Sequence, residues 1–249
     1  MASQRPPNAA AAAEPKIELY VKSSDDGEKV GANPFSQRLF MLLIAKGCDM
    51  TLNTVDTKRA AEYLKDLAPG TQLPFLVYNS EVKTDVNKIE EFLEETLKPP
   101  RYPSMTPKYK ESNTTGNDVF HKFSTYIKNQ SPEHEDHLEK SFLRSLLMLD
   151  RYLKTPLPHE LAKDPKITVS QRKFLDGDNL TLPDCNLLPK LYIINTVCKH
   201  YRNFEIPKEL QGLSRYLCHA GEVKAFVYTC PDPKEIIDFY RGVVKPMKK

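Results

Sequence analysis

The chain of 249 residues has no apolar run long enough to cross a bilayer and no CxxC motif. A membrane-spanning helix needs roughly 20 consecutive apolar residues, so the sequence predicts no ordinary transmembrane helix. Residues 1–15 (MASQRPPNAAAAAEP) lack the basic start and apolar middle of a signal peptide, and we interpret them as a flexible tail. The net charge of +3 is small, so we expect no nucleic-acid partner.

Cysteine is scarce, and its pattern excludes a disulfide framework. The five cysteines are odd in number and widely spaced, which fits a reducing compartment such as the cytosol. Cys185, Cys198 and Cys218 fall in helical patterns, so we expect small buried side chains there. A Gly-rich phosphate loop, a nucleophile elbow and HExxH are also missing. His134 and His137 have no third ligand in view, so we expect no metal site.

The amino-terminal part alternates between strand-like and helix-like patterns. Residues 17–21 alternate apolar and polar side chains, as a strand does. Pro34 suits the first turn of a helix that stops at Gly47. There follow a strand over residues 50–55, a short helix near 60–69, a hairpin over 74–84 with its turn at Asn79 and Ser80, and a helix near 88–97. This β-α-β-α-β-β-α order is typical of a thioredoxin-like domain, which we assign to residues 16–98.

The last helix of that domain is rich in glutamate. Paired carboxylates can serve acid–base chemistry, but these lie mostly opposite the apolar face of the helix. We therefore interpret them as a solvated surface. They are Glu90, Glu91, Glu94 and Glu95.

The rest of the chain has helical patterns. Residues 99–110 contain four prolines and are interpreted as a linker, followed by an all-helical domain over residues 111–249. Apolar stripes at helical spacing indicate core helices near residues 120–127, 138–153 and 187–201. Residues 154–172 predict a polar, proline-bearing loop between them. Thr181 and Asp184, three residues apart before an apolar run, have capping-box spacing, so we assign both to helix capping.

This order of domains is that of the glutathione-transferase fold: an α/β N-terminal thioredoxin-like domain plus an all-α C-terminal domain. Several segments go further and resemble the chloride intracellular channel family, whose members are similar to omega-class glutathione transferases. The resemblance is dense over roughly residues 16–240. The segments that carry it include PFSQRLFMLL, TVDTKR, APGTQLPFLVYN, KTDVNKIEEFLEETL, KFSTYIKN and RKFLDGDNLTLPDCNLLPKLYI.

The resemblance implies a protein with a soluble form that also associates with the lipid membrane and conducts chloride or other anions. It places the membrane-inserting segment at residues 33–55, where Arg38 and Lys46 are the cations that would favour anions in a pore. This segment is a poor span, because its apolar stretch is short and a charge near the bilayer centre costs about 2–4 kcal/mol. Insertion would therefore need refolding or self-association in the membrane.

The resemblance also implies a redox centre at the start of the first helix. The family commonly has a cysteine before the proline there, where the helix dipole and unpaired N–H groups stabilise a thiolate. This chain has Asn33 before Pro34. A carboxamide forms no disulfide but caps a helix well. We therefore assign no catalytic residue and expect no required cofactor.

Other parts of a glutathione-type site are kept in the sequence. Leu73 and Pro74 resemble the family's cis-proline bond, which presents backbone groups to a cysteinyl peptide. Thr84 and Asp85 resemble the pair that receives the γ-glutamyl end at a helix start. A turn and a helix cap would explain the same residues structurally. With the resemblance, glutathione is the small-molecule ligand to test.

Two other functions stay open at this stage. One is a glutathione-dependent oxidoreductase, which Asn33 argues against. The other is a non-enzymatic adaptor for cytoskeletal or trafficking proteins. We expect a cytoplasmic protein with a membrane-associated form. The basic residues 199–202 (KHYR) leave a nuclear pool open, although an exposed helix end explains them more simply.

Overall fold

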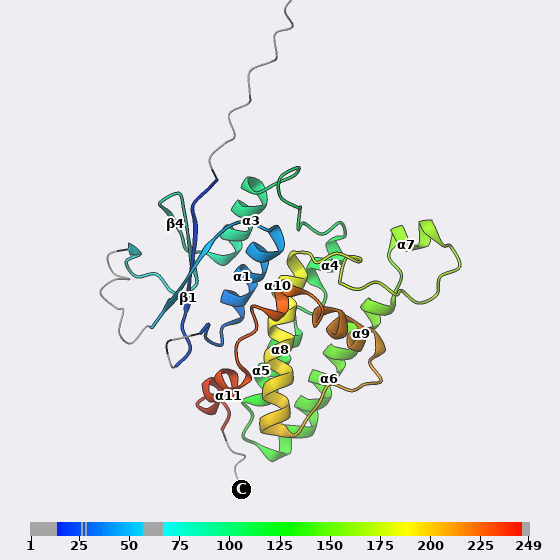
Figure 1. Cartoon of the computed structure of the whole chain (residues 1–249). Coiled ribbons are helices and arrows are strands. Elements are labelled where there is room, and N and C mark those ends of the chain that lie inside the picture. The colour runs from blue at the N-terminus through cyan, green and yellow to red at the C-terminus, as the bar shows by residue number, and fades with distance from the viewer. Residues whose placement is uncertain (1–13, 26, 28, 57–66, 246–249) are drawn as a thin grey trace, which may run out of the picture.

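The computed structural model describes residues 14–25, 27, 29–56 and 67–245. The described residues form a four-stranded sheet. Figure 1 shows this sheet at one end of the molecule, with a group of helices packed beside it. Helix α1 (Pro34–Lys46) lies between the sheet and the long helix α8 (Leu182–Arg202). The predicted thioredoxin-like sheet followed by a helical half is confirmed.

The sheet has the strand order β2-β1-β3-β4. Strand β1 pairs in parallel with β2 and antiparallel with β3, so the buried Leu19 faces Leu52 on one side and Leu76 on the other. The β3–β4 hairpin turns at Asn79 and Ser80, whose φ angles of 47° and 74° suit a tight two-residue turn. The strands are β1 (Ile17–Lys22), β2 (Thr51–Val55), β3 (Phe75–Tyr78) and β4 (Glu81–Lys83).

Helix α1 is a core helix whose ends follow the sequence signals. Pro34 occupies its first turn, and Gly47 ends it with a left-handed φ of 65°. Four of its apolar side chains are fully buried against the sheet and the helical half: Leu39, Met41, Leu42 and Leu43. Helix α3 (Val86–Thr96) lies on the same side of the sheet and contacts α1.

The helical half is organised around α8, which packs against α1, α5 and α11. Its buried side chains join those of the sheet and α1 in one continuous core. The other helices in the part of the chain that the structure describes are α4 (Lys110–Thr114), α5 (Val119–Ile127), α6 (Pro132–Lys154), α7 (Pro158–Lys163), α9 (Gln211–Ala220), α10 (Lys224–Val227) and α11 (Pro233–Arg241). Residues 97–109 form no helix or strand.

Three details differ from the sequence-based predictions or lie beyond them. The loop expected over residues 154–172 contains the short helix α7, and α6 extends into its start. Cys218 was expected to be buried, but its residue is exposed on α9, so that prediction is wrong. The short helix expected near residues 60–69 falls mainly on residues 57–66, outside the described residues.

Candidate functional site

Four of the six glutathione-like residues named from the sequence line one cleft, and the other two, Asn33 and Pro34, precede its lining residue Phe35 in the chain. The cleft lies where the first turn of α1, the loop before β3 and the start of α3 meet, and its volume is about 310 Å³. The Leu73–Pro74 peptide bond in it is cis, as the family resemblance implies. The full lining is Phe35, Arg38, Gln72, Leu73, Pro74, Thr84, Asp85, Val86 and Asn87.

Asn33 caps helix α1 at the edge of this cleft. Its backbone is extended, and its Oδ1 atom accepts hydrogen bonds from the N–H groups of Phe35 at 2.9 Å and Ser36 at 3.1 Å. These helix N–H groups are the donors that would stabilise a thiolate if a cysteine stood at this position. The amide oxygen of Asn33 already occupies them. The start of α1 is therefore closed to a substrate anion by the protein's own side chain.

Asp85 plays the same part for helix α3. Its Oδ1 atom accepts from the backbone N–H of Lys88 at 2.8 Å, so one carboxylate oxygen caps the helix. Thr84 and Asp85 are both exposed toward solvent beside the cleft. A carboxylate at this edge can still receive the ammonium group of a ligand, because only its Oδ1 atom serves the cap.

Arg38 forms one wall of the cleft, held by a carboxylate of α3. Its Nε atom donates to Glu90 Oε1 at 2.6 Å, and its Nη2 atom contacts Glu90 Oε2. The guanidinium also donates to Asn87 Oδ1 at 3.2 Å and to Asn186 Oδ1 of α8 at 3.4 Å. This single side chain thus ties α1 to α3 and to the helical half.

Lys46, at the other end of α1, is fully buried. Its Nζ atom lies 2.6 Å from Glu94 Oε1 and donates to the carbonyl oxygens of Leu97 at 2.8 Å and Pro103 at 3.0 Å. All three partners belong to α3 or to the segment after it. The two cations named as pore-facing in an inserted state therefore both point, in this fold, at carboxylates of α3.

The prediction that these glutamates are solvated was wrong for two of them. Glu90 is buried and Glu94 is largely covered, and each pairs with a cation of α1. The sequence did contain a signal. Two cations eight residues apart on a mainly apolar helix need partners, and carboxylates four residues apart share one helix face. No local pattern said which carboxylates they were.

The cysteines offer no thiolate to replace the one that Asn33 lacks. Burial raises the pKa of Cys48, of Cys198 to about 12 and of Cys230 to about 11, and raises that of Cys185 well above its usual range. Cys48 lies past the C-terminal end of α1, opposite Asn33, and donates to Leu43 O at 3.3 Å. Four of the thiols are thus protonated near neutral pH, and Cys218 lies on α9, outside the cleft.

Thr181 and Asp184 meet at the start of α8, as their spacing suggests. One Asp184 oxygen accepts from the Thr181 N–H and hydroxyl, both at 2.9 Å. The other accepts from Leu175 N at 3.0 Å and from the Tyr216 hydroxyl at 2.9 Å. Complete burial raises the pKa of Asp184 to about 6, although the hydrogen bonds lower it. This carboxylate holds together three parts of the helical half.

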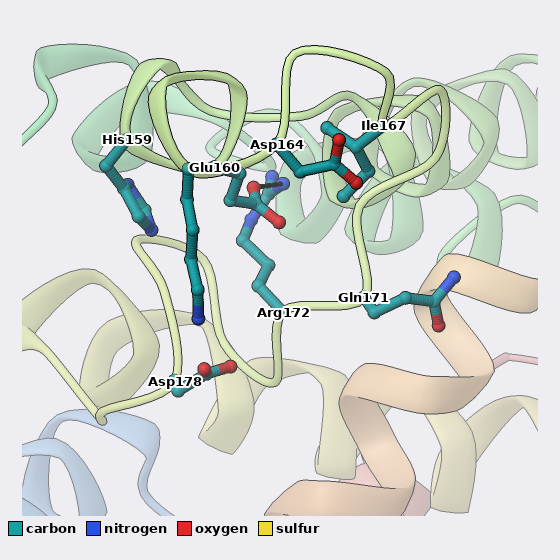
Figure 2. A pocket seen from close by; sticks show the side chains of 8 residues that line it. His159, Glu160, Asp164, Ile167, Gln171, Arg172 and Asp178 are labelled. Carbon is teal, nitrogen blue, oxygen red and sulfur yellow. Dashed lines mark ion pairs between the residues drawn. The ribbon is translucent and has the colours of Figure 1, made fainter.

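A second cavity, of about 250 Å³, lies beneath helix α7 (Figure 2). Arg172 at its floor donates to the carbonyl oxygens of Tyr152 and Thr155, each at 2.6 Å, and lies 3.5 Å from Glu160. Glu160 in turn accepts the hydroxyl of Ser170 at 2.7 Å. The floor groups already have protein partners, so we interpret this network as fixing the loop that carries α7.

The comparisons with known proteins agree with the resemblance seen in the sequence. The family described as CLIC-like N-terminal domain matches residues 15–100. Chloride intracellular channel protein 3 of Homo sapiens is 57% identical over 234 residues, which cover 94% of this chain and 99% of that protein. The Mus musculus protein of the same name is 56% identical, with 93% and 98% covered.

Solved structures give the same fold at lower identity. The CLIC homologue EXC-4 from C. elegans has a TM-score of 0.76 at 22% identity, covering 92% of this chain and 86% of that one. Dehydroascorbate reductase from Chlamydomonas reinhardtii has a TM-score of 0.73 at 21% identity, with 92% and 99% covered. Within the described ranges, no helix has both the length and the apolar character of a membrane span. The identity with the two curated relatives over nearly the whole chain shows that this protein belongs to the chloride intracellular channel family.

Proposed function

We propose that the protein is a chloride intracellular channel-like protein with a soluble cytoplasmic form and a membrane-associated form that conducts chloride. The observation that carries this is the 57% identity with human chloride intracellular channel protein 3 over 94% of the chain. Residues 33–55 are the segment proposed to insert, and self-association in the membrane would build the pore.

Insertion requires the N-terminal half to refold. Helix α1 is buried between the sheet and α8, and leaving that place breaks the Arg38–Glu90 and Lys46–Glu94 pairs. Removing one partner of a buried pair costs roughly 3–5 kcal/mol, so the folded form holds this segment firmly. In an inserted state the same two cations would be free to face water and anions.

For the cleft we propose binding of glutathione without thiol chemistry. Support comes from Pro74, Thr84 and Asp85, which share one cavity with a cis peptide bond at its edge. At the start of α1, Asn33 Oδ1 accepts the helix N–H groups that would otherwise stabilise a thiolate. This helix start therefore offers no group that could activate a sulfur atom or exchange with one. Asn33 thus weakens the oxidoreductase alternative, and no contact among the described residues favours an adaptor over a channel. Those partners, and a nuclear pool, stay predictions.

The decisive experiment uses wild type and Asn33→Cys in two assays. One measures glutathione-dependent reduction of a small disulfide in solution, and the other measures chloride release from liposomes. We expect both proteins to release chloride and only Asn33→Cys to reduce the disulfide. Calorimetric titration of wild type and Asp85→Ala with glutathione tests whether the cleft binds this ligand, because the substitution alters the cleft.

Each outcome decides between the alternatives. Disulfide reduction by the wild type would mean that a residue other than Asn33 carries redox chemistry. Absence of chloride release from both preparations would remove the channel proposal and favour the adaptor. Glutathione binding that Asp85→Ala leaves unchanged would show that the ligand lies outside the cleft.

A further inference from the structure

Helix α6 has a solvent face that combines exposed cations with large apolar side chains. Leu147 and Met148 are 37% and 56% exposed, whereas Phe142, Leu146, Leu149 and Leu153 of the same helix are buried. Arg144 and Arg151 lie on the same face, about one turn on either side, and are both exposed. Lys140 continues the face toward the N-terminus. We call Lys140, Arg144, Leu147, Met148 and Arg151 the α6 stripe.

The charge of this stripe is not neutralised by the protein. Within the part of the chain that the structure describes, Arg144 and Arg151 have no ion-pair partner, and Lys140 has only a distant one, Asp136 at 3.8 Å. The sole acidic residue of α6 beyond Lys140 is Asp150, which is buried and faces Lys154 at 2.9 Å. The exposed surface of this part of the helix is therefore cationic around an apolar centre.

We propose that the α6 stripe docks the folded protein on an anionic lipid surface. Arginine side chains pair with lipid phosphates and carboxylates, while leucine and methionine enter the boundary below the headgroups. The stripe extends about 16 Å along the solvent-facing side of one helix, and the cavities described above are lined by other residues. A cationic stripe on a helix surface suits a bilayer better than a bound peptide, because a peptide ligand needs a groove to bind in.

This inference rests on the proposed membrane association and names the surface through which the folded form makes first contact. Helix α6 lies on the side of the helical half away from the sheet (Figure 1). Docking there leaves α1 and its two buried ion pairs undisturbed. Peripheral binding and insertion are therefore separate steps, made by different parts of the molecule.

The test is co-sedimentation of the full chain with vesicles of phosphatidylcholine alone or mixed with phosphatidylserine. Arg144→Glu/Arg151→Glu should weaken binding to the mixed vesicles more than tenfold, since each cation lost at an anionic surface costs roughly fivefold. Leu147→Ser/Met148→Ser should weaken binding to a smaller extent, and added salt should weaken wild-type binding. Lys224→Glu/Lys234→Glu, the matched control, changes the net charge equally at exposed positions of two other helices and should bind like wild type.

The outcomes separate this proposal from the one it rests on. If wild type binds neither kind of vesicle and releases no chloride from liposomes, the membrane function itself fails. If wild type binds but the arginine variant binds equally well, or the control loses as much, the α6 stripe is not the docking surface. If sedimentation velocity shows a wild-type dimer that the stripe variants dissociate, a second copy of the chain covers this face and lipid docking there is wrong.

Discussion

Helices α1 and α8 begin in the same way, yet their first turns serve different ends. The N-cap residues, Asn33 and Thr181, are each followed within two residues by a proline, and the two helices pack against each other. The Asn33 cap is half-buried at the edge of an open cleft, next to Phe35, which is 46% exposed. The Asp184 carboxylate is completely buried with four hydrogen-bond donors around it. We therefore expect a change of side chain at the start of α1 to disturb the fold less than a change at Asp184 at the start of α8.

The largest effect is expected from Asp184→Ala. The substitution leaves the Leu175 N–H, the Thr181 N–H and both hydroxyl donors without their acceptor in a dry site. We expect the free energy of unfolding to fall by about 3–5 kcal/mol, measured by urea denaturation. Asp178→Ala, a neighbouring acid that borders a cavity, is the control and should cost much less. A loss no larger than that of the control would show that the Asp184 network is not essential.

Lys46→Met tests the buried pair that holds α1 to α3. The change leaves Glu94 without its cation and removes the donor for the Leu97 and Pro103 carbonyl groups. We expect a loss of about 3 kcal/mol in urea denaturation. Lys88→Met, at the exposed Lys88–Glu91 pair on α3, should change stability far less, because water screens an exposed ion pair. Equal effects at the two lysines would mean that burial of Lys46 contributes nothing.

The ion-paired cations Arg38 and Lys46 also show the limit of prediction from sequence. Apolar periodicity and the residues that begin or end an element are local signals. The ends of α1 and the hairpin turn were therefore predicted correctly from Pro34, Gly47 and Asn79. The partners of Arg38 and Lys46 come from another helix, and only tertiary packing brings Glu90 and Glu94 to them. The same limit explains why these glutamates were wrongly predicted to be solvated.

The cleft was foreseen for a different reason. Its residues, such as Pro74 and Asp85, were named through the resemblance to a family and not through spacing. The sequence did show directly that the thiol is missing at Asn33. It could not show that Oδ1 of Asn33 accepts from both Phe35 and Ser36, since that depends on the side-chain torsion adopted in the fold.

A pH series sharpens the contrast between the two caps. Burial raises the pKa of Asp184 from its usual 3.8 to about 6, so the folded state binds the proton more tightly than the unfolded chain. Stability from this group is complete below pH 3.8 and is lost as the pH rises through about 6. Relative to Asp184→Asn, wild type should lose about 2 kcal/mol between about pH 4.5 and 7. A constant difference between the two proteins across that range would contradict the raised pKa.

The smallest effect is expected at the half-buried cap, Asn33. Asn33→Ala removes the capping acceptor for the N–H groups of Phe35 and Ser36. Loss of an N-cap side chain typically costs about 1 kcal/mol, so the free energy of unfolding should fall by about that much. Asn33→Ser, which keeps a capping oxygen, should recover most of this loss. If Asn33→Ala were as costly as Asp184→Ala, the fold would depend on the first turn of α1 as strongly as on that of α8. The expectation that the side chain at position 33 can change at little cost in stability would then be wrong.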